Sequence, residues 1–328
     1  MYQMMSLPLY SGTLGEYNSW RDLGQELERL GCDGIEGVWG GEDLPKDLPA
    51  ELILGYHLIF YPDWLDFYRD DRAALKQKFG SLEVTASFYG GLGPDTLLEQ
   101  YRADLRRAVN LGARYVVFHV SDVSLEEGYT YRWLHTNQEV IDAAVEVVNL
   151  ILGEERWPFE FLVENQWWPG FTFTEPEETA RLLEGIRFAG KGILLDTGHL
   201  MNACTELKTE AEGADYIRRM LNRHGSLAKW VRGVHLHQSL SGAYVKAHTG
   251  SLPAGLPEDY MERFGVSYQH ILQIDQHRPL ADPAILSVLE QIEPRYLTHE
   301  LSSRGRMARA EAVSVQTRLL RQGGRMRV

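Results

Sequence analysis

The chain has 328 residues, of which 44% are apolar and 24% charged, a globular composition with enough apolar material for a large core. Lys and Arg number 33 against 46 Asp and Glu, a net charge of −13. This balance argues against a general nucleic-acid or anionic-membrane binder, because both depend on clustered positive charge. The two cysteines, Cys32 and Cys204, exclude a disulfide framework and a cysteine-rich zinc site.

Short apolar runs alternate along the chain with longer segments of helical period. The runs predict strands near 5–10, 33–38, 52–58, 114–120, 159–164, 192–196, 231–237 and 296–301. Helices are expected at 19–30, 95–111, 137–152, 175–188, 282–292 and 306–321. This order predicts an α/β protein, a (β/α)8 TIM barrel forming one domain over residues 1–328. A doubly wound sheet competes, but SGTLGE after the first strand is not its G-x-G-x-x-G turn.

Three further segments bear on the organisation of the chain. The N-terminus, MYQMMSLPLY, lacks the features of a secretory signal, and no window approaches about 18 apolar residues, so we expect a cytoplasmic protein with no membrane partner. The insertion at about 239–269 is long for a strand-to-helix connection and is interpreted as a lid or substrate loop, with a plain surface insertion as the alternative. The basic stretch 304–328 predicts a closing helix with a solvated charged face.

Six of the predicted strands are apolar until their last positions, which then carry a side chain able to bind a metal. These residues are His57, His119, Glu164, Asp196, His235 and Glu300. A lone histidine here is more often a satisfied core group, and a lone carboxylate is often a helix cap. A barrel, however, brings all its strand ends to one mouth, and burying several acids there is costly without a cation. The sequence therefore predicts a divalent metal site.

Strand alternation refines this set. Residues two apart share a face, so His235 and His237 point the same way, whereas His299 points away from Glu300 and is expected to be structural. In D-T-G-H, Gly198 permits a bend that returns His199 to the mouth. Carboxylates and imidazoles without cysteine suit Mn, Mg, Co or Zn, and more histidine ligands favour Zn.

Five motifs together resemble the xylose-isomerase-like barrel family, which includes sugar isomerases, epimerases and the endonuclease IV group. They are G-x-D-G-I-E (31–36), V-E-N (163–165), L-D-T-G-H (195–199), V-H-L-H-Q-S (234–239) and H-E-L (299–301). The resemblance implies that one ion is held by Glu164, Asp196, His235 and Glu300. Glu164 and Glu300 would also be the catalytic acid/base pair, moving a proton through a metal-stabilised enediolate. The implied function is a metal-dependent isomerase or epimerase of a sugar or sugar phosphate.

The implied substrate is a small polyhydroxylated molecule. Its binding residues would be His199, Glu36, Trp39, His57, His119, Trp167, His237 and Lys246, with Trp168 as a further aromatic candidate. The chain departs from the epimerase pattern at Ser241, where those enzymes carry an arginine; the nearest cation is Lys246. The later H-x-x-x-G-x-G segment is replaced by YQHILQIDQHRP (268–279).

The endonuclease IV group provides the alternative function, a phosphodiesterase with three zinc ions acting on abasic DNA. That resemblance adds His57, His119 and His199 as ligands, together with an Asp-x-His pair. The pair is either Asp275 with His277, or His270 with Tyr268 in the place of the Asp. The net charge and the absence of a Lys/Arg run interleaved with aromatics argue against nucleic acid as a partner. A non-catalytic barrel is the third class, and a homo-oligomer remains open.

Overall fold

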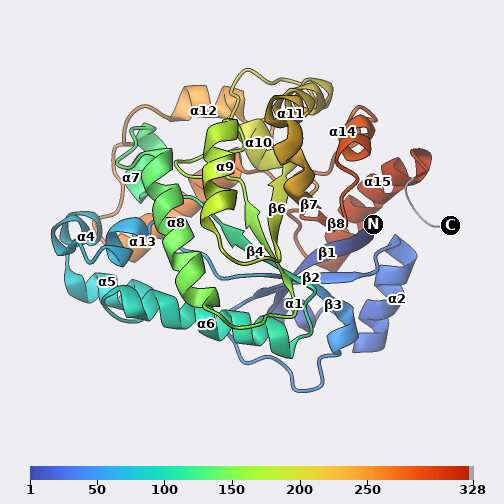
Figure 1. Cartoon of the computed structure of the whole chain (residues 1–328), viewed down its shortest axis with the longest axis horizontal. Coiled ribbons are helices and arrows are strands. Elements are labelled where there is room, and N and C mark those ends of the chain that lie inside the picture. Colours follow the sequence, from blue (N-terminus) through green and yellow to red (C-terminus); the bar gives the residue numbers. More distant parts are fainter. Residues whose placement is uncertain (325–328) are drawn as a thin grey trace.

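The computed structural model describes residues 1–324 and contains eight parallel strands that close into a barrel in the order β1 to β8 (Figure 1). The strands are β1 (Tyr2–Leu9), β2 (Gly34–Trp39), β3 (Ile53–His57), β4 (Tyr115–His119), β5 (Glu160–Glu164), β6 (Lys191–Asp196), β7 (Val231–His235) and β8 (Tyr296–His299). Each predicted strand overlaps one of these, and the predicted (β/α)8 barrel is confirmed.

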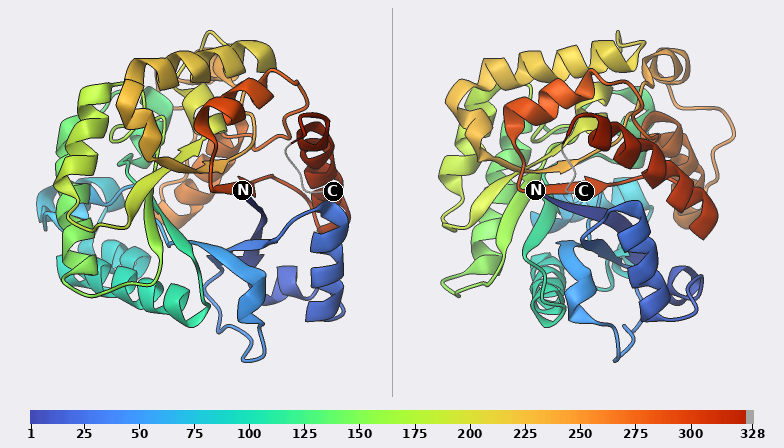
Figure 2. Two further views of the ribbon diagram at one scale, coloured as in Figure 1. Left: turned by 45° about the vertical axis from the view of Figure 1, so that its right-hand side comes forward. Right: turned by 90° about the vertical axis from the view of Figure 1, so that its right-hand side faces the viewer.

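Helices surround the barrel on its outside (Figure 2). They are α1 (Ser11–Leu14), α2 (Trp20–Leu30), α3 (Leu65–Tyr68), α4 (Arg72–Phe79), α5 (Leu82–Tyr89), α6 (Pro94–Asn110), α7 (Leu125–Thr130), α8 (Asn137–Leu152), α9 (Pro176–Gly185), α10 (Thr197–Asn202), α11 (Glu210–His224), α12 (Gly242–His248), α13 (Tyr260–Ile274), α14 (Ile285–Ile292) and α15 (Arg306–Gln322), with 3-10 turns η1 (Ala50–Leu52) and η2 (Gly225–Trp230). The six helices expected from periodicity are α2, α6, α8, α9, α14 and α15. Residues 325–328 of the basic stretch lie outside the described part. None of the helices within residues 1–324 is both long and apolar enough to cross a bilayer.

The helix ends follow from local chemistry. The Ser19 side chain accepts a hydrogen bond from the Asp22 amide at the start of α2, and Gly31 ends that helix in the left-handed region at φ 79°. Reciprocal capping boxes begin α7, α8 and α11, the last between Thr209 and Glu212. These caps fix where each helix starts and hence where the preceding loop leaves the barrel mouth.

The barrel interior has two layers, because every second side chain of a strand points inward. The lower layer is an apolar cluster that includes Met4, Tyr115, Leu162, Leu194 and Tyr296. Two positions after Leu162, Leu194 and Tyr296, the strands carry the polar residues Glu164, Asp196 and Thr298. Residues two apart share a face, so these polar side chains also point inward, closer to the mouth. His299 faces the other way, where its Nδ1 lies 2.8 Å from the Gln316 amide nitrogen of α15.

The long connection after β7 contains helices α12 and α13 rather than irregular chain alone. At its far end, the chain returns to the barrel through a short antiparallel bridge between Gln238 and Arg278. The Gln238 amide donates to the Arg278 carbonyl at 2.8 Å, and the reverse bond is 3.1 Å. This bridge holds residues 275–277 beside the end of β7.

We predict that Gly55→Ala destabilises the barrel. A Cβ at Gly55 would lie 2.3 Å from the ring carbon Cζ of Tyr115, a residue that the barrel interior leaves no space to move. Overpacking of this kind costs about 1–3 kcal/mol in the free energy of unfolding. Urea denaturation measures the change, with Gly24→Ala as the control.

Gly24 lies inside α2, and outside its chain neighbours and the backbone of its own helix no described atom lies within 4 Å of a Cβ there. We expect its alanine variant to raise the free energy of unfolding by up to about 1 kcal/mol, because alanine is the better helix former. Equal stability of Gly55→Ala and the wild type would contradict the described packing.

Candidate metal centre

The strand ends bring a central cluster of four candidate ligands together. One ligand atom from each of Glu164, Asp196, His235 and Glu300 lies within 4.8 Å of the others. His235 Nδ1 is 2.8 Å from Glu300 Oε2, 3.5 Å from Glu164 Oε1 and 3.7 Å from Asp196 Oδ2. The first three residues are fully buried, and the Glu300 side chain is 17% exposed. The four ligands implied by the sequence motifs therefore converge on one point.

A second cluster adjoins the first through Glu164. Its members are His57, His119 and Glu164, and the Nε2 atoms of the two histidines are 3.0 Å apart. They lie 3.4 and 3.1 Å from Glu164 Oε2. The His57 Nδ1 donates to the Leu58 carbonyl at 2.8 Å. In the neutral ring, this leaves Nε2 as an unprotonated atom facing a carboxylate.

A third cluster lies on the other side of Asp196. It combines His199, His237, Asp275 and His277. Asp275 Oδ2 is 2.5 Å from His277 Nε2 and 3.2 Å from His199 Nε2, while His237 Nε2 is 2.8 Å from Asp196 Oδ2. His277 has a left-handed backbone, φ 46°, which is uncommon for a residue other than glycine.

Of the two Asp-x-His alternatives, the structure brings Asp275 and His277 to the mouth and leaves His270 elsewhere. The His270 ring stacks on Tyr129 at 4.3 Å. Its Nδ1 lies 2.9 Å from the Tyr244 hydroxyl, and its Nε2 lies 3.2 Å from the Gly128 carbonyl oxygen. The His270 side chain therefore packs α13 against α7.

The chemistry of these donors fits divalent cations. Both oxygens of Glu164 and both ring nitrogens of His235 are buried without a hydrogen bond, although they lie at ion-pair distances from one another. Burial disfavours the ionised form of Glu164, but the His119 and His235 imidazoles outweigh it and hold the pKa well below its usual range. Burial likewise opposes the charge on His235, yet Glu300, Glu36 and Glu164 raise that pKa well above its usual value. The site therefore requires positive charge, from protons or from metal ions.

Glu36 sits beneath the central cluster and does not line the cavity above it. Its Oε1 is 2.9 Å from His235 Nε2, and its Oε2 accepts hydrogen bonds from the Tyr115 hydroxyl at 2.6 Å and the Thr298 hydroxyl at 3.0 Å. The sequence suggested Glu36 as a substrate-binding residue; the structure places its carboxylate against His235 Nε2 and away from the cavity lining. The alternation of inward and outward side chains along β4 and β8 was the signal in the sequence that could have placed Tyr115 and Thr298 inside the barrel.

The remaining predicted residues are divided between the mouth and the outside. A cavity of about 940 Å³ opens above the clusters, lined among others by His57, His119, Trp167, Trp168, His199 and Glu300. Trp39 and Lys246 do not line it: the Arg107 guanidinium lies 3.8 Å above the Trp39 ring, and Lys246 pairs with Glu206 at 2.6 Å. Ser241, in the place of the epimerase arginine, is buried, and its hydroxyl accepts a hydrogen bond from the Asn202 side-chain amide at 2.7 Å.

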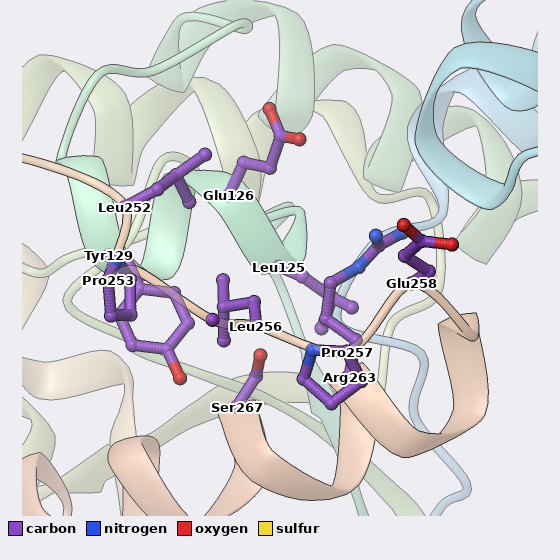
Figure 3. Close-up of a pocket in the computed structure, with 11 residues that line it drawn as sticks. Leu125, Glu126, Tyr129, Leu252, Pro253, Leu256, Pro257, Glu258, Arg263 and Ser267 are labelled. Carbon is purple, nitrogen blue, oxygen red and sulfur yellow. The ribbon is translucent and has the colours of Figure 1, made fainter.

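A second cavity, of about 310 Å³, is bounded by α7, the 252–258 loop and α13 (Figure 3). Arg263 and Ser267 of α13 line it, whereas Tyr268, Ile271 and Leu272 of the same helix line the cavity above the clusters. Helix α13 thus separates the two cavities, and none of the described residues predicted for the site lines the smaller one.

Comparison with known proteins gives the same architecture. A family model described as a xylose isomerase-like TIM barrel matches residues 25–320. A D-tagatose 3-epimerase-like protein has 15% identity and a TM-score of 0.55, covering 99% of this chain and 98% of that one. Endonuclease IV from Thermus thermophilus has 16% identity and a TM-score of 0.54, with coverages of 98% and 100%. An L-ribulose 3-epimerase has 12% identity and a TM-score of 0.54, with coverages of 98% and 94%. A search of curated proteins gives no significant match.

We predict that Glu36→Gln weakens zinc binding by about 10- to 100-fold, the usual cost of losing a carboxylate that orients a histidine ligand. The variant keeps the shape of the side chain but loses the negative charge beside His235 Nε2. Competition with a chromogenic chelator measures the affinity. An unchanged titration in a folded variant would contradict the orienting role.

Proposed function

Because the chain belongs to the xylose isomerase-like TIM barrel family, we propose that it is a metal-dependent enzyme that hydrolyses phosphate esters at a three-ion centre. The central cluster would hold one ion and each flanking cluster another. Imidazole and carboxylate donors together favour Zn²⁺ over Mg²⁺. This is the alternative that the sequence kept open through its resemblance to the endonuclease IV group.

The observation that carries the proposal is the His57–His119–Glu164 cluster. A one-ion isomerase uses only Glu164 of these three residues, which leaves two imidazoles facing each other at 3.0 Å beside a buried carboxylate. Such a group is costly to bury unless a cation lies among its members. The third cluster repeats the arrangement around Asp275.

The residues of the chain have distinct tasks in this proposal. Bound ions would polarise the phosphoryl oxygens and lower the pKa of an attacking water. Asn165 fixes the position of Asp196, since the Asp196 amide donates to Asn165 Oδ1 at 2.9 Å and Asn165 Nδ2 donates to the Asp196 carbonyl at 3.1 Å. Glu300 lines the cavity, so its carboxylate would be able to accept a proton from the attacking water.

The isomerase or epimerase favoured by the sequence is the second candidate. The central cluster supports it, because it contains the four ligands that a one-ion member of the family would use. Glu164 argues against it, since this carboxylate is fully buried among imidazoles and does not line the cavity. Incorporation of solvent deuterium next to the carbonyl of a ketose, observed by NMR in a sugar panel, would decide in favour of the isomerase.

We predict that the zinc-loaded protein hydrolyses bis(p-nitrophenyl) phosphate and that a chelator abolishes this activity. His119→Asn should lower kcat by at least about 100-fold, because it removes a donor beside Glu164. His248→Asn is the matched control, since His248 is exposed on α12. Activity that survives metal removal, or equal loss in both variants, would refute the proposal.

We also predict a distinct metal content for each cluster. The wild type should bind up to three zinc ions, and His57→Asn and Asp275→Asn should each bind one fewer while staying folded. Metal analysis after gel filtration measures the content, and circular dichroism checks folding. Wild-type content in both variants would exclude the two flanking ions.

A further inference from the structure

Two exposed aromatic side chains stand beside the flanking clusters, and the hydrolysis of phosphate esters does not by itself require them. Phe60, in the loop after β3, is 48% exposed, yet its ring centroid is only 4.5 Å from that of His119. Tyr268 of α13 is 51% exposed. Both line the 940 Å³ cavity together with Asp275 and His277. A large ring left open to water beside a binding site is a surface on which another flat ring can pack.

The positive charge around the cavity is sparse. Among the described residues that line it, the arginines are Arg304 and Arg309. Arg309 is buried and engaged with Glu16 and the Tyr17 hydroxyl. Arg304 follows β8, is exposed, and has no ion pair with another side chain of residues 1–324. Within the described chain, the cavity therefore offers one free arginine in addition to the metal clusters.

A duplex nucleic acid needs far more positive charge than this. Proteins that bind duplexes neutralise several phosphates along the backbone, often about 6–10, and the net charge here is −13. The volume of 940 Å³ lies at the upper end of the usual range for small-molecule pockets, about 300–1,000 Å³. The cavity matches a ligand with one or two anionic groups and an aromatic ring.

We propose, on the basis of the proposed phosphate-ester hydrolysis, that the substrate is a small nucleotide-like phosphodiester and not a duplex. Its phosphodiester lies at the metal clusters, its base packs on the ring of Phe60, and Arg304 binds a second phosphate. Tyr268 closes the side of the cavity next to Asp275. Hydrolysis then adds water across one P–O bond and releases a phosphomonoester and an alcohol.

Binding measurements test the proposal without relying on turnover. Isothermal titration calorimetry of the zinc-loaded protein compares its affinity for adenosine 5′-monophosphate with its affinity for ribose 5-phosphate, which lacks the base. Stacking of a base on an aromatic side chain is worth about 10-fold or more in affinity. We expect adenosine 5′-monophosphate to bind at least about 10-fold more tightly, and Phe60→Ala to remove this difference while leaving ribose 5-phosphate unchanged.

Matched controls separate these contacts from general effects. Trp133→Ala removes another exposed aromatic that does not line the cavity, and it should keep the preference for the base. Arg304→Gln should remove the tighter binding of adenosine 3′,5′-bisphosphate over the monophosphate, whereas Arg318→Gln, on the exposed side of α15, should not.

Two results would overturn the inference. One is equal affinity for adenosine 5′-monophosphate and ribose 5-phosphate; the other is a higher kcat/KM on an abasic duplex than on thymidine 5′-(p-nitrophenyl phosphate). Failure of the proposed function looks different, because no phosphate ester would then be hydrolysed with any divalent ion while the nucleotide affinities could still be measured.

Discussion

The mutual compensation of buried carboxylates and imidazoles is the constraint on which the rest of the site depends. Both carboxylate oxygens of Glu164 lie inside the barrel, where a charge is costly. The surrounding histidines stabilise this buried carboxylate. Backbone carbonyls hold two of these rings as well, that of Leu58 for His57 and that of Asn165 for His199. A cation among these side chains would compensate the negative charge of the group.

The scaffold beneath this group explains how it stays in register. Tyr115 reaches up from the apolar layer to Glu36, and Glu36 reaches His235. Thr298 of β8 binds both Glu36 and the Tyr115 hydroxyl. Three strands thus fix one imidazole from below, which leaves its other nitrogen facing the mouth. Hydrogen bonds from Tyr115 and Thr298 to Glu36, and the close contact of Glu36 with His235 Nε2, thus connect the apolar core to the mouth.

The strands and the central cluster could be predicted from the sequence, because the alternation of side chains along a strand is a local property of the chain. Apolar runs located all eight strands, and their final residues identified the members of the central cluster. Helix α11 was missed although Thr209 and Glu212 form a recognisable capping box and Ala214, Ile217 and Leu221 lie on one buried stripe. The sequence left the choice between Asp275 and His270 open because it depends on how α12, α13 and the bridge to Gln238 fold back. Phe60 lies beyond a strand end, where alternation no longer applies.

Glu164 belongs to two clusters at once, one oxygen facing each, and this sharing has a thermodynamic consequence. In the proposed three-ion centre, an ion at one position would change the charge at the neighbouring position, so the two occupancies would be coupled. By reciprocity, whatever the first ion does to the affinity for the second, the second does equally to the first.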